Sequence, residues 1–518
     1  MPSSDQEQPI NTDTLPAKSE NNSEFVPFGD PLPPGLEAYL RTTNPWWEGE
    51  RMPKPPPFRR WLFEPTLRRF KKGMTHAVVL RGTRQVGKTT LQEQIIYHLL
   101  YEEGVPANRI FRVQFDAAPF LDPVQVPLLA LSHWFERNVL GETFNAWGWK
   151  DQQAYLLFDE AQIIKGWSDQ LKMLVDHQMV RVLLTGSSAF KIEKGRDSLA
   201  GRISTLNMNT LLLREISALR GWEEIPPLLP FNGVTPLRDQ TFWEELREHG
   251  KRHKKGRDKA FAAFSERGGY PIAQLYADEL SWDETVTQLN ETVIQRVLRH
   301  DLGEAPNPKL LEQVLRLACR YAGQSPGRAV FLRELHSNLS PNITWQDVLT
   351  QLQLLNDTLL VRLVPPMELR LKGQKGNTDK ICLVDHSLRA SWLREKVPLT
   401  PKGLQKASHL AHLAGFLAES IAGYFLSSIP SLDVTWFAAR KTEPEVDLMV
   451  TIGYHNIPIE VKYRHTIREG RDTKNLRAFM DKPIYDAPFG ILLTLTDDVQ
   501  ISDKRIIALP LSSLLLMR

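Results

Sequence analysis

Residues 75–187 alternate between short apolar strands and helical segments, and this alternation constrains the fold more than any other feature of the chain. The predicted strands are THAVVLRG, RIFRVQFD, AYLLFDE and VRVLLTGSS. Helices are predicted between them, from Lys88 to about Tyr101, in the 120s and 130s, and from about Trp167. Strands that are apolar without interruption are buried on both faces. The pattern therefore predicts an α/β fold with a parallel sheet covered by helices on both sides.

The segment GTRQVGKTT, Gly82–Thr90, joins the first strand to its helix and has the spacing G-x-x-x-x-G-K-[ST]. Two glycines allow a tight turn, and backbone amides at a helix N-terminus surround a phosphate. Lys88 would neutralise the outer phosphates of ATP, and the Thr89 hydroxyl would bind Mg²⁺. A glycine-rich turn without a ligand is the alternative. The expected residues of this ATP and Mg²⁺ site are Gly82, Gln85, Val86, Gly87, Lys88, Thr89 and Thr90.

Polar residues follow the next strands at the edge where ligands bind in open α/β sheets. In YLLFDEAQ, Asp159 would hold Mg²⁺ and Glu160 would polarise the attacking water, which separates ATP hydrolysis from ATP binding. Thr185 or Ser187 would sense the γ-phosphate, or would cap a helix instead. Arg202 in SLAGRIS is a candidate arginine finger in cis or from a neighbouring subunit, and a structural salt bridge is its alternative. Lys88, Glu160 and Arg202 are the expected catalytic residues here.

The chain turns helical between about 214 and 305 and carries the basic run REHGKRHKKGRDK at 247–259. A solvated helix face and a nucleic-acid patch are both open for this run. Residues 307–372 hold three helical segments, the apolar strand VRLV and the stretch RLKGQKG. This order is that of a winged helix-turn-helix with Trp345–Leu355 as the recognition helix, unless that helix serves packing alone. DNA is therefore an expected partner.

The C-terminal part, from about 380, predicts a mixed sheet formed by KICLVD, DVTWFAA, EVDLMVTIG, IPIEVKY and FGILLTLT. In IPIEVKY, Glu460 and Lys462 emerge on one face of the strand. Asp447, on the preceding strand, would lie beside Glu460, and a divalent cation would relieve the repulsion of the two acids. Lys462 would orient a water and neutralise a phosphate, and Glu419 would add a further ligand. The metal ligands predicted for the whole chain are Thr89, Asp159, Glu419, Asp447 and Glu460.

Asp447 with Glu460-x-Lys462 is the pattern of a PD-(D/E)xK phosphodiesterase site. A structural ion pair is one alternative, and a fold that binds DNA without cleaving it is another.

Composition and the chain ends limit the remaining classes. The net charge of +3 is nearly neutral, so nucleic-acid affinity must come from local basic faces. Two distant cysteines indicate neither a metal knuckle nor a disulfide framework and fit a reducing cytosol. The first residues have no apolar core of a secretory signal, and the apolar segment 409–429 is interrupted by His412 and Glu419. A cytoplasmic protein that does not enter a membrane is expected.

Seven segments together resemble a prokaryotic family of ATPases that have an N-terminal AAA-type domain and a C-terminal domain labelled DUF4143. They are GTRQVGKTT, LLFDEAQIIKGW, LLTGSSA, SLAGRI, RGGYP, KICLVD and EVDLMV with IPIEVKY, over about 75–465. The resemblance implies a P-loop ATPase joined to a winged-helix segment and a restriction-endonuclease-like fold. It implies nucleotide roles for Lys88, Thr89, Asp159 and Glu160, and nuclease-type roles for Asp447, Glu460 and Lys462. The extension to about 60 and the basic segment near 250 depart from the family pattern.

The expected organisation has five parts: a disordered, Pro-rich extension at 1–60, an AAA-type ATPase core at 61–215, a helical lid or linker at 216–305, a winged-helix-like domain at 306–378 and a PD-(D/E)xK nuclease-like domain at 379–518. The leading hypothesis is an ATP-hydrolysing protein whose nucleotide state controls DNA engagement and metal-dependent DNA cleavage. The rival is a nucleotide-dependent switch that binds DNA or protein through an inactive C-terminal scaffold. Assembly into a homo-oligomer stays open.

Overall fold

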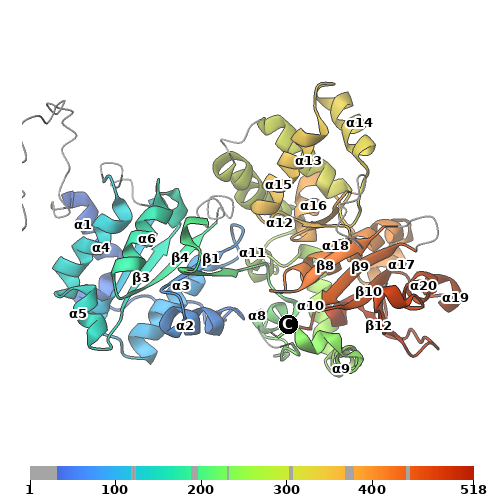
Figure 1. Ribbon diagram of the computed structural model, residues 1–518, viewed down its shortest axis with the longest axis horizontal. Helices are drawn as coiled ribbons and strands as arrows, with labels where there is room; N and C mark the ends of the chain where they lie inside the picture. The colour runs from blue at the N-terminus through green and yellow to red at the C-terminus, as the bar shows by residue number, and fades with distance from the viewer. Residues whose placement is uncertain are drawn as a thin grey trace, which may run out of the picture.

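A computed structural model describes residues 32–117, 121, 124–187, 197–229, 233–302, 307–367, 378–438 and 444–518. Figure 1 shows an elongated molecule with an N-terminal α/β domain at one end and a C-terminal α/β domain at the other. Helices between the two domains, and a helical group above them in that view, complete the chain. The first 31 residues and the predicted stretch RLKGQKG lie outside the described residues.

The N-terminal domain contains the predicted parallel sheet, in the strand order β2-β3-β4-β1-β5. Its strands are β1 Ala77–Arg81, β2 Ile110–Gln114, β3 Ala154–Asp159, β4 Val180–Gly186 and β5 Ile203–Asn207. Sequence reasoning missed β5 because ISTLN is mostly polar and only partly buried, as suits an edge strand. The order places β4 between the strand that leads into the glycine-rich loop and the strand that ends at Asp159.

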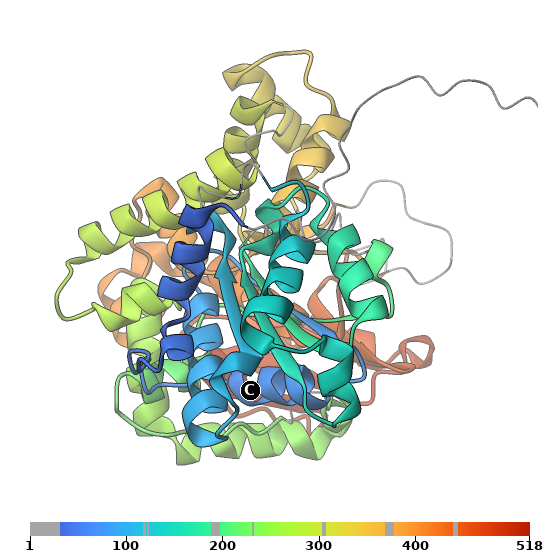
Figure 2. The same ribbon diagram turned by 90° about the vertical axis from the view of Figure 1, so that its left-hand side faces the viewer.

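Helices cover both faces of this sheet (Figure 2). They are α1 Pro34–Thr43, α2 Phe63–Lys72, α3 Lys88–Tyr97, α4 Pro127–Phe135, α5 Phe144–Trp149 and α6 Trp167–His177. Successive strand residues point to opposite faces, so Val78 and Leu80 belong to one buried cluster while Ala77 and Val79 belong to the other. The two-sided burial explains why these strands are apolar without interruption.

The prediction of a disordered extension up to residue 60 is wrong for the part that the structure describes. Leu36 and Leu40 of α1 are fully buried against the N-terminal sheet. Trp46 and Trp47 both donate their indole N–H to the carbonyl of Ile110, at 3.1 and 2.9 Å. The sequence did not reveal this packing because the surrounding residues are rich in proline. Proline-rich composition is compatible both with disorder and with an extended segment that packs on a domain.

The central helices are α8 Leu213–Leu219, α9 Gln240–Arg252, α10 Lys254–Arg267, α11 Pro271–Leu275 and α12 Trp282–Leu289. Their basic run is paired with acids, for example Lys251 with Glu248 at 2.9 Å. Arg257 is 1% exposed and bonds Asp497 of the C-terminal domain at 2.7 and 2.6 Å. The run is therefore largely neutralised in place, and one of its arginines joins the central helices to the C-terminal domain.

The helical group consists of α13 Pro308–Arg320, α14 Arg328–Asn338, α15 Trp345–Asp357 and α16 His386–Leu393. Strand β7, Lys380–Leu383, pairs antiparallel with β6, Val361–Val364. The prediction that KICLVD belongs to the C-terminal sheet is therefore wrong. Both sides of β7 are buried, and an isolated apolar strand carries no information about which sheet it joins.

The C-terminal domain contains a mixed sheet in the order β12-β11-β10-β9-β8. Its elements are α17 Pro401–Lys406, α18 Ala411–Ser427, β8 Asp433–Phe437, β9 Val446–Ile452, β10 His455–Lys462, α19 Glu469–Asp472, α20 Lys474–Met480, β11 Gly490–Thr494, β12 Ile506–Pro510 and α21 Leu511–Leu514. Strands β8, β9 and β10 are antiparallel, whereas β10, β11 and β12 run parallel.

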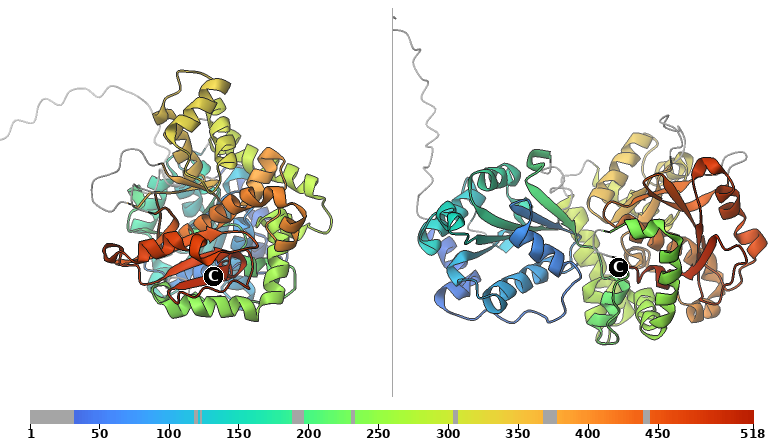
Figure 3. Two further views of the ribbon diagram at one scale, coloured as in Figure 1. Left: turned by 90° about the vertical axis from the view of Figure 1, so that its right-hand side faces the viewer. Right: turned by 60° about the horizontal axis from the view of Figure 1, so that its bottom comes forward.

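Helix α18 lies against this sheet (Figure 3). Among the described residues, Ser408–Ser427 is the one helical stretch that is long and apolar enough to cross a membrane, and half of its apolar window is buried inside the protein.

The end of the chain lies between the two halves of the molecule (Figure 1). Leu229 donates its backbone N–H to the carbonyl of Met517 at 2.8 Å. The guanidinium of Arg518 lies 4.3 Å from the ring centre of Trp61, just before α2. The C-terminal segment thus packs simultaneously on the central helices and on the N-terminal domain.

Candidate functional site

The glycine-rich loop has the backbone conformation that its sequence predicts. Gly87 has φ 94° and directly precedes α3, and Gln85 has φ 64°. A Cβ atom on Gly82 would come within 2.3 Å of the carbonyl oxygen of Met208. The loop therefore needs glycine at both positions, because one is left-handed and the other is in close contact with backbone.

Lys88 and Thr89 are the first residues of α3, and their side chains contact different parts of the site. The Lys88 ammonium donates to the carbonyls of Gly82 and Thr83, both at 2.9 Å, which holds it over the loop. The Thr89 hydroxyl donates to Asp159 Oδ2 at 2.8 Å. Thr90 follows on the same helix.

Asp159 also accepts a hydrogen bond from the Thr185 hydroxyl on β4. One carboxylate thus ties the loop helix, β3 and β4 together. A hydroxyl and a carboxylate oxygen in contact form the hard-oxygen donor set that Mg²⁺ prefers, so Thr89 and Asp159 fit the predicted ion.

Glu160 is held in a defined position next to Asp159. Its backbone is left-handed, with φ 53°, and its side chain is 9% exposed. Glu160 Oε2 accepts hydrogen bonds from Gln162 Nε2 at 2.5 Å and from the Ser187 hydroxyl at 2.8 Å. This backbone conformation is strained for any residue other than glycine, and strained residues are concentrated at functional sites. In this structure Ser187 therefore contacts the predicted base, while Thr185 contacts the predicted magnesium ligand.

Arg202 is not directed at these residues. Its Nε donates to Asp176 Oδ1 on α6 at 2.6 Å, which is the salt-bridge alternative considered for it.

Two further residues at the loop were not predicted. Burial raises the pKa of Asp116, which follows β2, and the charges of Asp159 and Glu160 raise it further. Arg60 donates to the carbonyl of Val86 at 2.6 Å and to Glu215 Oε1 at 2.9 Å, and both side chains of the pair are almost fully buried. The signal for Asp116 was present, since it ends a strand as Asp159 does. Arg60 carried no sequence signal.

The segment RGGYP connects the loop to the rest of the chain. Tyr270 is fully buried, and its hydroxyl lies 3.4 Å from the hydroxyl of Thr83 in the loop. Gly269 donates its backbone N–H to Asp385 Oδ2 at 2.6 Å, and Asp385 caps the N-terminus of α16. A short chain of direct contacts therefore leads from the phosphate-binding loop to the helix that follows β7.

The second predicted constellation lies between α18, β7 and the C-terminal sheet. Asp447 Oδ2 accepts the backbone N–H of Val461 at 2.8 Å, so the two acid-bearing strands are adjacent as predicted. Lys462 forms an ion pair with Glu460 Oε1. Glu460 Oε2 is buried and makes no hydrogen bond to any described residue.

Lys380, which was not predicted, changes the arrangement of the acids. Its ammonium lies 2.8 Å from Glu419 Oε2 and 2.7 Å from the backbone oxygen of Asp447, and its side chain is 3% exposed. The carboxylate predicted to bind a metal thus forms an ion pair with Lys380, and the role of Glu419 as a metal ligand stays a prediction. In the part of the chain that is described, no group of three or more His, Cys, Asp or Glu side chains is placed to hold a metal ion.

Three carboxylates and two ammonium groups leave this buried cluster with one excess negative charge when all are ionised. Burial raises the pKa of Glu460 to about 8, and repulsion from Asp447 adds to the effect. The same two causes raise the pKa of Glu419 to about 8. The two lysines oppose these shifts without cancelling them. The cluster therefore retains a proton at a pH where an exposed glutamate has lost it.

Comparison with known proteins gives one family assignment for each of two segments. Residues 74–217 match the AAA domain family, and residues 258–398 match a domain of unknown function, DUF8612. An uncharacterized protein of Methanocaldococcus jannaschii is 30% identical over 121 residues, which is 23% of this chain and 23% of that protein.

Two solved structures share 14% sequence identity with the chain. A Walker-type ATPase of Pyrococcus abyssi aligns over 66% of this chain and 99% of its own, with a TM-score of 0.38. The ORC1 protein of Aeropyrum pernix in complex with DNA aligns over 74% and 97%, with a TM-score of 0.25.

The AAA match covers all five strands of the N-terminal sheet together with the glycine-rich loop. Residues 74–217 are thus similar to an AAA domain over the whole of the parallel sheet. The DUF8612 match runs from α10 through α16 and includes both Tyr270 and Asp385. The DUF4143 assignment of the C-terminal part stays a prediction.

Proposed function

We propose that this protein hydrolyses ATP in its N-terminal domain with the help of Mg²⁺. The observation that carries the proposal is the contact of Thr89 with Asp159 beside Lys88, with Glu160 fixed one residue further along. When bound, Mg²⁺ would neutralise charge on the β- and γ-phosphates. Thr89 and Asp159 would hold the ion, Lys88 would bind the phosphates, and Glu160 would orient the attacking water. Ser187 and Gln162 keep the Glu160 carboxylate in place.

A Mg²⁺-dependent ATPase assay of the full chain tests this proposal. Lys88→Ala should abolish turnover, because the phosphates lose their only lysine in the loop. Glu64→Gln is the surface control, since Glu64 is exposed on α2. Phosphate release that is the same in wild type and Lys88→Ala would place hydrolysis elsewhere.

We further propose that the nucleotide state controls DNA engagement by the second half of the chain. The contacts from Thr83 through Tyr270 and Gly269 to Asp385 support a mechanical connection between the two. Helices α13, α14 and α15 followed by the β6–β7 hairpin have the order of a winged helix, which supports DNA as the partner. Fluorescence anisotropy with duplex DNA, with ADP or a non-hydrolysable ATP analogue present, would detect the coupling. Equal affinity in both nucleotide states would refute it.

Metal-dependent DNA cleavage by the C-terminal domain is a second candidate function. One observation that favours it is the buried Glu460 Oε2, which has no hydrogen-bond partner among the described residues and lies next to Asp447. The other is the element order of this domain, in which helix α18 is followed by the antiparallel strands β8, β9 and β10, by helix α20 and by the parallel strand β11. This is the order expected for a PD-(D/E)xK fold. Asp447 and Glu460 would bind the cation, and Lys462 would face the phosphate.

Nicking of supercoiled plasmid in Mg²⁺ or Mn²⁺ tests this second function. Asp447→Asn should remove the activity, whereas Asp433→Asn, on the exposed end of β8, should keep it. If the chain does not nick DNA, and Asp447→Asn leaves its divalent-cation binding unchanged, the C-terminal domain would be a scaffold, which is the rival hypothesis.

A further inference from the structure

Strand β7, which is not part of the C-terminal sheet, brings a lysine into the acidic cluster of the C-terminal domain. Lys380 is the first residue of this strand, and its ammonium donates to Glu419 Oε2 at 2.8 Å and to the backbone carbonyl of Asp447 at 2.7 Å. Glu419 and Asp447 are two of the residues predicted to bind a divalent cation. A positively charged side chain is therefore bonded to both of them.

The packing of β7 against α18 fixes the position of this lysine. The backbone N–H of Leu383 donates to the Ser420 hydroxyl of α18 at 2.9 Å. A Cβ atom on Gly423, about one turn further along α18, would lie 2.6 Å from the Cys382 sulfur, so the helix and the strand are in close contact. Lys380 is therefore held against Glu419 by the packing of its strand as well as by the ion pair.

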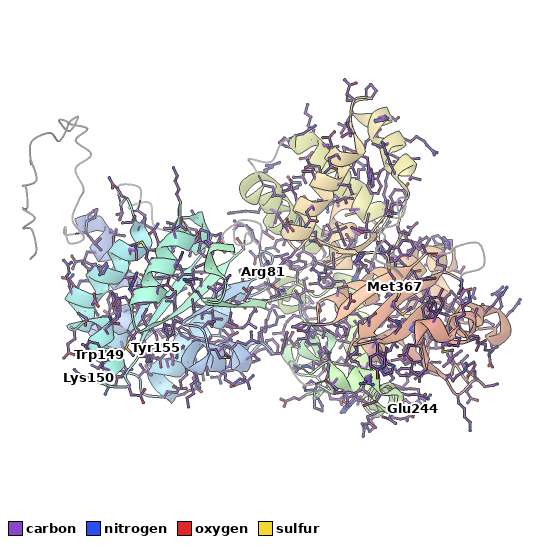
Figure 4. All side chains as sticks on the ribbon, in the orientation of Figure 1. Arg81, Trp149, Lys150, Tyr155, Glu244 and Met367 are labelled. Carbon is purple, nitrogen blue, oxygen red and sulfur yellow. The ribbon has the colours of Figure 1, made fainter. Side chains whose placement is uncertain are left out.

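The segment that follows β6 is anchored to the C-terminal sheet beside the same lysine. Met367, labelled in Figure 4, donates its backbone N–H to the carbonyl of Trp436 on β8 at 2.7 Å. The Lys380 ammonium lies 5.7 Å from the ring centre of Trp436, within the range of a cation–π attraction. An acid, a carbonyl oxygen and an aromatic face thus surround the ammonium, and each of them stabilises a cation.

The rest of the cluster has capacity for more positive charge. Lys462 forms an ion pair with Glu460 Oε1, whereas Glu460 Oε2 is buried and has no hydrogen-bond partner among the described residues. The three carboxylates exceed the two ammonium groups by one charge when all are ionised. If a divalent cation took the place of Lys380, its two charges and that of Lys462 would balance the three carboxylates. A divalent cation therefore matches the charge of this cluster better than the lysine does.

We propose that Lys380 is the internal counter-ion of this cluster and that it competes with a divalent cation for the carboxylates. The cation-binding role proposed for Asp447 and Glu460 is a premise of this inference, whereas DNA cleavage is not. Carboxylate oxygens use the same lone pairs to accept a hydrogen bond and to bind a metal ion. A cation must therefore displace the ammonium from Glu419 or bind next to its positive charge. Removing the ammonium should strengthen cation binding, whereas a purely structural ion pair predicts no such gain.

Binding of Mn²⁺ to the full chain without nucleotide tests the competition, with the free ion measured by electron paramagnetic resonance. Lys380→Met should lower the Kd for Mn²⁺ by about tenfold or more, because the ion no longer meets the charge of the lysine. Adding Asp447→Asn should abolish this gain, which assigns the ion to the cluster and not to Thr89 and Asp159. Lys402→Met, at an exposed position of α17, is the control and should bind Mn²⁺ as wild type does.

A second measurement uses the loss of stability that Lys380→Met is expected to cause. Removing one partner of a buried ion pair destabilises the folded state, because the remaining charge stays out of water. A divalent cation that replaces the ammonium restores the missing charge and stabilises the state that binds it. Saturating Mn²⁺ should therefore raise the melting temperature of Lys380→Met by more than that of wild type. A variant that is unfolded without Mn²⁺ should fold when the ion is added.

Two results overturn the counter-ion role of Lys380: a Kd for Mn²⁺ that is not lower in Lys380→Met than in wild type, or no greater stabilisation of the variant by Mn²⁺. Failure of DNA cleavage gives a different result. Tighter Mn²⁺ binding by Lys380→Met in a chain that nicks no DNA keeps the counter-ion and removes cleavage. A chain that nicks DNA and binds Mn²⁺ equally tightly with and without Lys380 keeps cleavage and removes the counter-ion.

Discussion

Replacing Arg60 by methionine should destabilise the N-terminal domain, because it leaves the buried carboxylate of Glu215 without its ion-pair partner. Arg60 is 6% exposed, and its guanidinium bonds Glu215 at 2.9 Å, Val86 O at 2.6 Å and the carbonyls of Asn209 and Thr210 at 2.9 and 3.1 Å. Without the arginine, Glu215 keeps the backbone N–H groups of Trp61 and Leu212 but loses the guanidinium that balances its charge.

The magnitude follows from the burial of the pair. Removing one partner of a buried ion pair costs about 3–5 kcal/mol, because the remaining charge stays out of water. The equilibrium constant for unfolding should therefore rise by about two to four orders of magnitude, since about 1.4 kcal/mol corresponds to tenfold. Arg60→Lys should lose less, because it keeps the charge while losing the planar fork.

Adding Glu215→Gln to Arg60→Met gives a direct check on this reasoning. Glutamine keeps an oxygen for the two backbone donors and removes the charge, so the double variant should be more stable than Arg60→Met by about 1 kcal/mol or more. Urea denaturation followed by tryptophan fluorescence measures the series. A double variant that is as unstable as Arg60→Met, or less stable, would refute the electrostatic explanation.

Three further predictions concern the connection to the loop and the buried acids. Tyr270→Phe should leave the fold intact but weaken the dependence of DNA affinity on nucleotide, measured by anisotropy; unchanged dependence would exclude the tyrosine hydroxyl from the connection. Gly268→Ala should lower the free energy of unfolding, measured by heat or urea, by about 1–3 kcal/mol. Gly268 has φ 78°, and a Cβ atom there would lie 2.1 Å from Asp385 Oδ1. Gly327→Ala is the control, because a Cβ atom at Gly327 would meet open space. The free energy of unfolding should fall as pH rises from about 4.5 toward 8, because the folded state, with the pKa of Glu419 and Glu460 raised, binds more protons than the unfolded state in that window. In Glu419→Gln/Glu460→Gln protein this slope should flatten, and a slope equal to that of wild type would contradict the assignment.

The sequence was most informative where chemistry depends on neighbours in the chain. Gly82, Gly87, Lys88 and Thr89 lie within one loop and one helix turn, so their spacing alone specifies their geometry. Asp159 was found for a related reason: it ends an apolar strand, and the carboxyl ends of parallel strands share an edge.

Residues whose role depends on tertiary contact escaped prediction. Lys380 opens an apolar strand and looked like an ordinary polar boundary, yet it is buried between Glu419 and Asp447 because β7 pairs with β6 under α18. Arg60 lies in a segment rich in proline and tryptophan, and its carboxylate partner, Glu215, follows 155 residues later in the chain. Side chains of this kind are fixed by packing between elements, which no local pattern encodes.

The most direct measurement of the central claim compares ATP binding with ATP turnover in Glu160→Gln protein. The substitution removes the charge that would polarise the water while leaving Lys88, Thr89 and Asp159 untouched. We predict that the variant binds ATP and Mg²⁺ with the affinity of wild type and releases phosphate at a rate lowered by about two orders of magnitude or more, the scale of general-base catalysis. Wild-type turnover in this variant would contradict the role of Glu160, and failure of the wild-type chain to bind ATP would contradict the site as a whole.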